Sequence, residues 1–402
     1  MTGGRHFLFL QGPQGPFFQR LGARLAADGH GVTRLNINGG DRHDWPDGER
    51  VRVGPAAWPG HVADRMDALG VTDLIVYGDC RRVHAEAVAA ANARTIAVHV
   101  FEEGYLRPGW MTLERGGVNG FSPLPRNPQA IRQRAAALGP PPAPPALPPS
   151  GRTRGWGTFM YYTRSHWKRL LLRDPAYPWH RGIWPLTEGL GYARRWLRRV
   201  SDARLTAAAR EKISGKRYFV LPLQMDADFQ LRNHAEVLSM RTGLARILDD
   251  FAANAPPDTW LIVKEHPHDN GLVTWHGLIH GERVVHSPGG DLDDMLAGAA
   301  GLVTINSTSA MAALAGGVPV KALGSAIYDV PGLTHQGDLA AFWDTPEPPD
   351  ADLWTAFRSV VIHDALVAGD HGSEAGLALL VERAAAKLSM APLASVDGRQ
   401  AA

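Results

Sequence analysis

The sequence predicts an α/β protein with two Rossmann-like, doubly wound domains facing a cleft. Three observations support this prediction. Short apolar runs typical of buried parallel strands alternate with helical segments along both halves of the chain. At 402 residues the chain is too long for one ordinary core, so two domains are expected. A polyproline stretch at residues 138–150 separates the two halves.

The first domain is expected to span residues 1–137. Its strands are predicted at residues 7–10, 32–37, 73–77 and 95–101. The loop after the first strand contains two glycines and two prolines, which fix an unusual backbone path. The glycine spacing does not match a dinucleotide-binding fingerprint, so we expect no such cofactor there.

A connecting region is expected between the two domains. Residues 138–155 are predicted to form a Pro-rich linker, and residues 156–212 a helical segment rich in Trp, Tyr and Arg. Aromatic and cationic side chains together suit the headgroup layer of an anionic bilayer. Two alternatives stay open: an interdomain segment whose aromatic residues pack inward, and a surface that stacks nucleic-acid bases.

The second domain is expected at residues 213–345, with strands that begin near residues 218, 260, 284 and 301. Residues 346–390 are predicted to form C-terminal helices, placed so that they are able to return to the N-terminal domain. Within them, residues 353–390 have the pattern of one or two amphipathic helices. Residues 391–402 are predicted to be a disordered tail.

An anion site is predicted in the second domain. An apolar strand runs into Asn306, Ser307, Thr308 and Ser309 and then into a helix. Such a turn offers free backbone N–H groups, hydroxyl donors and the positive end of a helix at one point, which favours phosphate. A capped helix with no ligand is the alternative.

A second polar cluster follows the strand that begins at residue 260. It comprises Lys264, Glu265, His266 and Pro267. Because ligands of open α/β sheets bind beyond the carboxyl ends of the strands, this cluster would meet the turn at 306–309 if the two strands are neighbours. Together they predict a nucleotide-linked donor in this domain.

Polar side chains also follow the strands of the first domain. They are Asn38, Asp41, Asp79, Glu102 and Glu103. One aspartate at a strand end is an ordinary helix cap, but several around one rim predict a site that handles a hydroxyl-rich substrate or removes a proton.

Composition excludes several classes of protein. The chain has 42 Lys and Arg against 40 Asp and Glu, which argues against a general polyanion binder. Cys80 is the single cysteine, so no internal disulfide is possible and a reducing compartment is expected. We see no signal peptide and no apolar run near the ~18 residues that a membrane span needs. A cytoplasmic or membrane-peripheral protein is expected.

A set of motifs is spread over residues 7–343. It consists of Leu10-Gln11-Gly12-Pro13 with Gly15-Pro16-Phe17-Phe18, Asn38-Gly39-Gly40-Asp41, Tyr77-Gly78-Asp79-Cys80, Phe101-Glu102-Glu103-Gly104-Tyr105-Leu106-Arg107-Pro108, Gln224 with Asp228 and Gln230, Lys264-Glu265-His266-Pro267, Ile305-Asn306-Ser307-Thr308-Ser309, and Gly332-Leu333-Thr334-His335-Gln336. In this set the chain resembles the capsule polysaccharide biosynthesis proteins, in particular the KpsS-type transferases of 3-deoxy-D-manno-octulosonic acid (Kdo).

The resemblance implies a GT-B-like, retaining glycosyltransferase that needs no metal or cofactor. It implies that the enzyme takes β-Kdo from CMP-Kdo and adds it to lyso-phosphatidylglycerol, the lipid on which the capsule linker begins. It further implies a peripheral place on the inner face of the inner membrane. There the partners would be a capsule assembly and export complex and a second Kdo transferase, and no nucleic acid.

Roles for individual residues follow from the resemblance. Retention suggests two displacements and hence a carboxylate nucleophile, for which Asp228 is expected and Asp226 held in reserve. Glu102, ahead of Glu103, is expected to be the base; Asp79 and His84 are weaker candidates. His266, as an imidazolium, would bind the donor phosphate with Lys264, Pro267, Asn306, Ser307, Thr308 and Ser309. Substrate contacts are expected from Gln11, Gly12, Gly15, Asn38, Asp41, Asp79, Arg107, Gln224, Gln230 and His335.

Some alternatives stay open at this point. Asp226-Ala227-Asp228 spells a metal-binding DxD motif, which we discount because three-residue matches are frequent by chance. The donor sugar rests on the resemblance alone, so a transferase of another CMP-ulosonate, of the sialic acid type, is an alternative. A non-catalytic component of capsule assembly or export is the alternative from another class.

Overall fold

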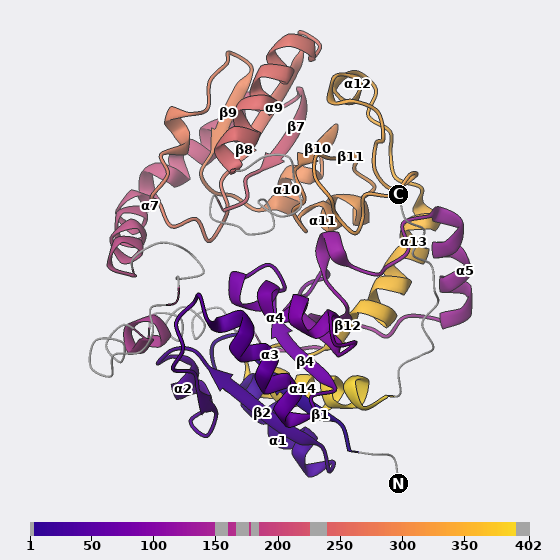
Figure 1. Cartoon of the computed structure of the whole chain (residues 1–402). Coiled ribbons are helices and arrows are strands. Elements are labelled where there is room, and N and C mark those ends of the chain that lie inside the picture. Colours follow the sequence, from indigo (N-terminus) through magenta and orange to yellow (C-terminus); the bar gives the residue numbers. More distant parts are fainter. Residues whose placement is uncertain (1–3, 149–159, 166–176, 178–184, 226–238, 391–402) are drawn as a thin grey trace.

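The computed structural model describes residues 4–148, 160–165, 177, 185–225 and 239–390, which form two α/β lobes (Figure 1). The predicted α/β class is confirmed, with one Rossmann-like sheet in each lobe in a GT-B-like layout. Asp226, Asp228, Gln230 and the predicted tail at 391–402 lie outside the described residues.

The first lobe is built on a seven-stranded sheet in the order β12-β6-β5-β4-β1-β2-β3. The strands are β1 (His6–Phe9), β2 (Gly31–Asn36), β3 (Glu49–Arg50), β4 (Asp73–Tyr77), β5 (Ala97–Glu103), β6 (Trp110–Arg115) and β12 (Leu366–Ala368). The run from β3 to β5 is parallel, whereas β6 and β12 are antiparallel additions at one edge. Every residue of β4 is buried, as expected of a central parallel strand covered on both faces.

The second lobe contains a five-stranded sheet in the order β11-β10-β7-β8-β9, parallel throughout. Its strands are β7 (Arg217–Pro222), β8 (Thr259–Lys264), β9 (Val284–Ser287), β10 (Gly301–Thr304) and β11 (Val320–Ala322). The two strands behind the predicted donor clusters are β8 and β10, and β7 lies between them. They are therefore not neighbours, although their carboxyl ends share one edge of the sheet with the end of β7.

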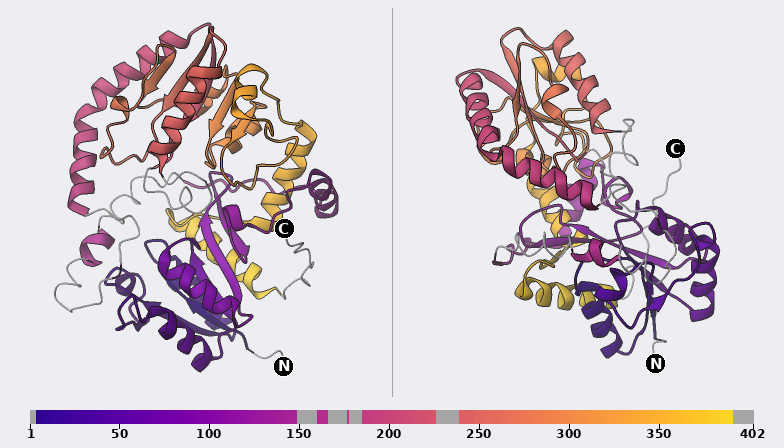
Figure 2. Two further views of the ribbon diagram at one scale, coloured as in Figure 1. Left: turned by 45° about the horizontal axis from the view of Figure 1, so that its top comes forward. Right: turned by 90° about the vertical axis from the view of Figure 1, so that its left-hand side faces the viewer.

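Helices cover both faces of each sheet (Figures 1 and 2). In the first lobe, the core on one face includes α1 (Phe17–Ala27) and α14 (Glu374–Ser389), and the core on the other includes α3 (Trp58–Leu69) and α4 (Arg82–Asn92). In the second lobe, α9 (Met240–Asn254) and α12 (Leu339–Asp344) lie on one face, and α10 (Leu292–Leu296) and α11 (Ala310–Ala315) on the other. Both sheets are therefore doubly wound.

The C-terminal region returns to the first lobe, where it adds a strand as well as a helix. The sequence predicts one or two helices over residues 353–390, but α13 (Ala351–Val360) and a π-turn at Val361–Ala365 are followed by strand β12. β12 pairs antiparallel with β6, and α14 then packs against α1. Three residues of strand are too few to interrupt a helical pattern visibly in the sequence.

The two lobes share one hydrophobic cluster. Helix α5 (Pro128–Leu138) of the first lobe packs against α13, and Ile131 of α5 is fully buried there. The cluster joins Tyr105 and Leu124 of the first lobe to Val220 and Ile262 of the second. At its rim, Arg134 makes a two-pronged ion pair with Asp364, with N–O distances of 2.8 and 2.6 Å. The lobes are thus held together by a common core as well as by the chain.

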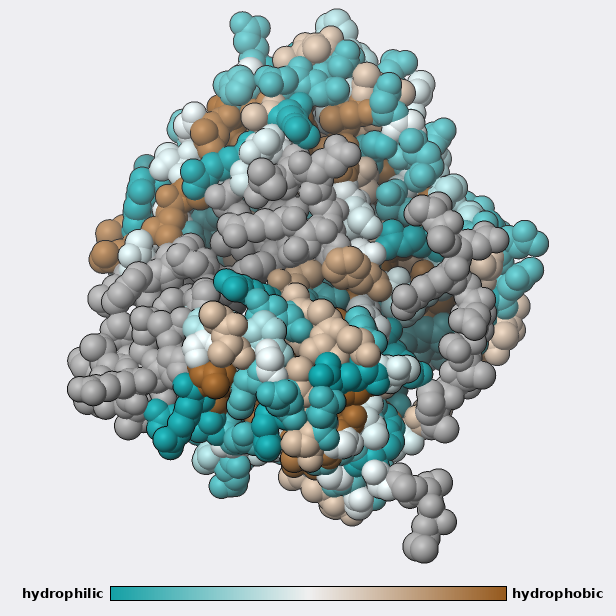
Figure 3. All heavy atoms as spheres, viewed as in Figure 1, coloured by the Kyte–Doolittle hydropathy of each residue, from teal (hydrophilic) through white to brown (hydrophobic). Residues whose placement is uncertain are grey.

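Helix α7 (Pro185–Ile213) is 29 residues long and runs along the outside of the second lobe, against β9 (Figure 2). Hydrophobic residues lie along it on the molecular surface (Figure 3). Within the described residues, no helix is both long enough and apolar enough to cross a bilayer.

Candidate active site

Polar side chains follow three adjacent strands at one edge of the second sheet. Gln224 follows the central one, β7, and its amide group holds the turn after β10. Its Nε2 donates to Asn306 Oδ1 at 2.9 Å, and its Oε1 accepts from the Asn306 backbone N–H at 3.3 Å. Two of the residues that the sequence assigns to the substrate and donor sites are thereby brought together.

The turn at residues 306–309 differs from its prediction, which gave it free backbone N–H groups. The amides of Asn306, Ser307 and Ser309 are bonded to the side chains of Gln224, Thr304 and Ser307, respectively. Helix α11, which follows, is six residues long, so few peptide dipoles add up at its start. Ser307 Oγ accepts from both the amide and the hydroxyl of Ser309, at 3.2 and 2.9 Å, so its own proton is left to donate elsewhere. What the turn offers an anion is mainly hydroxyl groups.

His266, which follows β8, is held as a neutral donor by its surroundings. The backbone N–H of His268 donates to His266 Nδ1 at 3.0 Å, so the neutral ring carries its proton on Nε2. Burial lowers the pKa of His266 to about 4, helped by nearby positive charge. The contributing groups are His268, Lys264, Arg107 and Arg195. Without a phosphate, the protein's own groups therefore keep the ring neutral, and the predicted imidazolium would require a bound phosphate to raise the pKa again.

The positive charge around His266 comes from three parts of the chain. Lys264 ends β8 and is buried, which lowers the pKa of its amine. Arg195 extends from α7 and donates to the carbonyl oxygens of Asp269 at 2.6 Å and His266 at 3.3 Å. Arg107 belongs to the loop between β5 and β6, in the first lobe. An electropositive point at the carboxyl edge of a parallel sheet is suited to a phosphate.

The sequence gives no signal for two contacts at this corner, one made by Arg195 and one made by Glu265. Arg195 lies in a basic run, and the sequence alone does not show which of its arginines reaches the corner. The carboxylate of Glu265 lies 2.7 Å from His286 Nε2 on β9, although Lys264 precedes it directly in the chain. The side chain of Lys264 contacts only the backbone carbonyl of Glu265, at 3.4 Å, among the bonds described for it.

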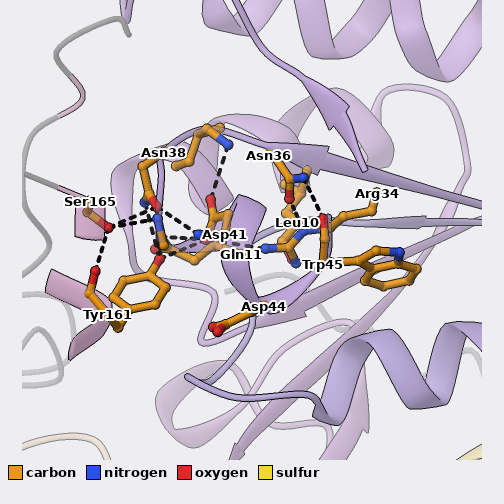
Figure 4. Close-up of polar contacts among 12 residues, drawn as sticks. Leu10, Gln11, Arg34, Asn36, Asn38, Asp41, Asp44, Trp45, Tyr161 and Ser165 are labelled. Atoms are coloured by element: carbon orange, nitrogen blue, oxygen red, sulfur yellow. Dashed lines mark hydrogen bonds and ion pairs between the residues drawn. The ribbon is translucent and has the colours of Figure 1, made fainter. Parts of the chain in front are cut away.

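In the first lobe, the structure gathers the buried Gln11 and Asp41 and the half-buried Asn38 into one network (Figure 4). Tyr161, in the short described stretch at 160–165, donates to Asp41 Oδ1 at 2.7 Å and accepts from Gln11 Nε2 at 2.8 Å. Asn38 Oδ1 accepts from the Asp41 amide and from Ser165 Oγ, at 2.9 and 3.2 Å. These three residues thus anchor the 160–165 stretch, and Gln11 Oε1 also accepts from the guanidinium group of Arg81 at 2.9 Å.

A small hollow lies beside this network. It is lined by Gly12, Pro13, Gly15, Phe18, Gln19, Arg34, Asp41, Asp44 and Trp45. Gly15 has a φ of +102° and donates its N–H to Asp44 at 3.1 Å, and Gly12 lies against the ring of Phe18. Burial raises the pKa of Asp44 to about 7, so this carboxyl group is protonated in a large fraction of the molecules at pH 7.

Asp79 and His84 hold the end of β4. Asp79 Oδ2 accepts from the amide of Val118 at 3.0 Å, which ties the strand end to the loop after β6. His84 is fully buried, and its Nδ1 bonds the carbonyl oxygen of Gly78 at 2.7 Å. Burial, with a contribution from Arg81, lowers the pKa of His84 to about 3.

Glu102 and Glu103 lie within β5 rather than after it, as its last two residues. Consecutive strand residues point to opposite faces, so the two carboxylates have different neighbours. Glu103 Oε1 accepts from the Tyr77 hydroxyl at 3.0 Å and lies 3.4 Å from His371 Nε2. His371 lies in the loop before α14. The glycines around it predict a loop, but they do not indicate that its side chain contacts Glu103. Glu102 lies on the other face, beside Gly78.

Among the predicted site residues of the second lobe, His335 is not joined to the carboxyl edge of the sheet by the described contacts. His335 is buried near β11, where its ring packs against Phe342 and lies 3.4 Å from Glu347. Asp228 and Gln230 lie outside the described residues. Within the residues that the structure describes, no three His, Cys, Asp or Glu side chains form a cluster able to hold a metal ion.

Known proteins resemble this chain over most of its length. The sequence profile described as "Capsule polysaccharide biosynthesis protein" matches residues 72–371. The capsule polysaccharide export protein KpsS of Escherichia coli is 33% identical over 380 residues, which cover 90% of this chain and 95% of that protein. The capsule polysaccharide modification protein LipB of Neisseria meningitidis serogroup A is 33% identical over 395 residues, 92% of each chain.

Among solved structures, KpsC, a β-Kdo 2,7 transferase of Thermosulfurimonas dismutans, aligns with most of this chain. It has a TM-score of 0.44 and 14% identity, and the match covers 88% of this chain and 89% of that one. The family profile and the two relatives at 33% identity confirm the resemblance found in the sequence. This chain belongs to the capsule polysaccharide biosynthesis protein family.

Proposed function

We propose that this protein is a retaining glycosyltransferase that moves β-Kdo from CMP-Kdo to lyso-phosphatidylglycerol, the first step of the capsule linker. It works without a metal, bound peripherally to the cytoplasmic face of the inner membrane, beside a second Kdo transferase and the capsule export machinery. The observation that carries the proposal is the electropositive corner at His266, in a chain that matches a KpsS protein over 90% of its length. Arg107 of the first lobe and Lys264 and Arg195 of the second contribute positive charge to that corner.

The donor phosphate is proposed to bind between His266 and the turn at 306–309. Nε2–H of His266 and the hydroxyl of Ser307 donate to phosphate oxygens, while Lys264 and Arg107 supply charge. CMP leaves as a phosphate monoester, so its departure depends on charge stabilisation more than on protonation. Gln224 follows β7, which lies between the strands that precede His266 and the turn, and its bond to Asn306 keeps the turn in place.

The chemistry is proposed to proceed in two displacements. The carboxylate of Asp228 attacks the anomeric carbon of Kdo, the bond to the CMP phosphate oxygen breaks, and CMP departs with the electron pair. The acceptor hydroxyl then attacks the same carbon as Glu102 takes its proton, and the bond to Asp228 breaks. Two inversions give net retention.

Transfer is tested by incubating the purified protein with CMP-Kdo and a fluorescent lyso-phosphatidylglycerol and measuring the product by mass spectrometry. One added Kdo is expected. Asp228→Asn should abolish product, and Glu102→Gln should reduce kcat by about a hundredfold or more while Glu103→Gln has a smaller effect. If the protein transfers from CMP-sialic acid and not from CMP-Kdo, the donor is a sialic acid nucleotide. No transfer from either donor would point to a non-catalytic role in assembly or export.

Donor binding is tested separately by calorimetry with CMP. His266→Ala should weaken binding about tenfold, because one hydrogen bond to a charged group is lost. His266→Gln is the matched control, since its amide nitrogen is able to donate from the position of Nε2 and should restore most of the affinity. Equal affinities in all three proteins would remove His266 from the phosphate site.

A further inference from the structure

Helix α7 carries its apolar side chains on the outside of the molecule. Leu190, Trp196, Leu197 and Val200 are 72%, 61%, 73% and 58% exposed. Their spacing places them on one side of the helix, together with Ala193. A surface helix of a globular protein normally turns this side toward the core, so the orientation of α7 is the reverse of the usual one.

The inner side of α7 fixes that orientation. Gly191 lies so close to the backbone of residue 270 that an added Cβ would be 2.0 Å from the Asn270 carbonyl oxygen. Arg195 is bonded to the loop carbonyls of His266 and Asp269, and Ala209 and Ile213 are buried against the second lobe. The helix therefore has no freedom to rotate its apolar side inward without breaking these contacts.

Arginines border the apolar side. Arg194 and Arg198 lie on one flank and Arg199 on the other, and Arg204 follows Val200 one turn later on the same side as Leu197; all four are exposed. The guanidinium group of Arg199 lies over the ring of Trp196, with 4.3 Å to the ring centroid. Long apolar stems with charged heads beside Trp and Leu are typical of helices that lie in the plane of a bilayer surface.

We propose that the outer face of α7, formed by Leu190, Trp196, Leu197 and Val200 with Arg194, Arg198 and Arg199, docks onto a bilayer of anionic lipid. The density of positive charge argues against a second copy of this chain as the occupant, because two such faces would repel each other. The biological purpose rests on the proposed function, since a lipid acceptor would be met at that surface. The binding itself does not depend on it.

Docking would place the donor site next to the lipid. The same helix that meets the bilayer reaches inward through Arg195 to the corner that contains His266. The membrane face and the candidate phosphate site are thus opposite sides of one rigid element.

Flotation of the full-length protein with vesicles tests this proposal, with no donor or acceptor present. The protein should float with vesicles of phosphatidylethanolamine and phosphatidylglycerol and stay behind with phosphatidylcholine alone. The apolar variant Leu190→Ser/Trp196→Ser/Leu197→Ser should bind at least about tenfold more weakly. The charge variant Arg194→Gln/Arg198→Gln/Arg199→Gln should do the same and lose the salt dependence of binding. The matched control is Phe121→Ser, an aromatic residue 60% exposed on the first lobe, which should bind as the parent protein does.

Each result decides the proposal independently of transferase activity. Failure of the parent protein to float with anionic vesicles, or flotation of both α7 variants at the parent level, overturns it. A dimer in gel filtration that the apolar variant converts to a monomer also overturns it, in favour of self-association. Urea unfolding of the apolar variant should match that of the parent, which shows that the lobes are intact and keeps this outcome separate from the questions of donor binding and transfer.

Discussion

Buried polar side chains at the strand ends of the first lobe bond mostly to one another. Asp41 is 1% exposed, and its carboxylate accepts from the Tyr161 hydroxyl and from the amide of Ile37 and pairs with Arg34 at 3.3 Å. A carboxylate removed from water is tolerated only with such partners, because the cost of desolvation otherwise exceeds the cost of protonating it. A strand-end aspartate is therefore as consistent with holding a neighbouring segment as with binding a sugar.

His84 allows this principle to be tested through pH. Its pKa is lowered from 6.5 to about 3 in the folded protein. Between these values the unfolded chain binds a proton that the folded chain does not, so the free energy of unfolding falls as the pH falls below 6.5. The contribution of neutral His84 to the free energy of unfolding is complete above pH 6.5. It falls by about 1.4 kcal/mol per pH unit below that value, so about 2 kcal/mol is lost at pH 5.

We expect His84→Asn to separate this contribution from those of the other histidines. Asparagine keeps a donor for the carbonyl oxygen of Gly78 but does not titrate. At pH 7.5 the variant should be about 1–2 kcal/mol less stable than the parent because of imperfect packing, and at pH 5 the difference should nearly vanish. Urea unfolding at both values measures it. A difference that is the same at pH 7.5 and pH 5 would show that His84 does not remain neutral in the fold.

What the sequence predicts at this scale is the kind of residue at each strand end, and what it misses is the partner. Asn306 and Gln224 were both predicted to bind ligand, but the side-chain amide of Gln224 is bonded to Asn306. The sequence gives no signal for this pairing. His266 was expected to be an imidazolium at the donor phosphate, but burial lowers its pKa, and the charges of Arg107 and Arg195, remote in sequence, add to this effect. Such contacts depend on the packing of the lobes and have no local sequence signal.

Strands and helices show the same division between local and distant information. The parallel strands at 73–77 and 218–223 are apparent from apolar runs, because burial on both faces demands them. β12 is three residues long and exists because β6 offers it an open edge. The helix that follows it, α14, completes the core of the first lobe from the other end of the chain, packing Leu380 into the cluster that contains Leu21 and Leu25 of α1.

Leu380→Ala should therefore destabilise the first lobe although it lies close to the C-terminus. Leu380 is fully buried, so we expect a loss of about 2–4 kcal/mol in the free energy of unfolding. Glu382→Ala on the same helix is the matched control: it removes an exposed ion pair with Arg24 and should cost less than ~1 kcal/mol. Urea denaturation of both variants measures this, and equal, small effects would mean that α14 is dispensable to the core.

For the whole molecule, the shared hydrophobic cluster decides whether the lobes behave as independent domains. Interfaces between domains of one chain are commonly polar, and their domains then unfold separately. Here α5 of the first lobe packs against α13, which the chain enters after completing the second lobe, and the cluster continues to Val220 and Ile262 in the second sheet. Because this interface is part of the core, we expect the two lobes to unfold together.

Ile131→Ala is the change that tests this expectation, since Ile131 of α5 is fully buried in the shared cluster. It should lower the stability of both lobes by about 2–4 kcal/mol in one transition, because the cavity it leaves belongs to the core they share. Hydrogen exchange measured by mass spectrometry distinguishes the lobes: amides of β4 and of β8 should lose protection by the same amount. Arg132→Ala, which removes an ion pair between half-exposed side chains of α5 and Asp350, should change neither strand measurably. Loss of protection in β4 alone, or two separate transitions in the parent protein, would show that the lobes are thermodynamically independent and that Ile131 stabilises only its own.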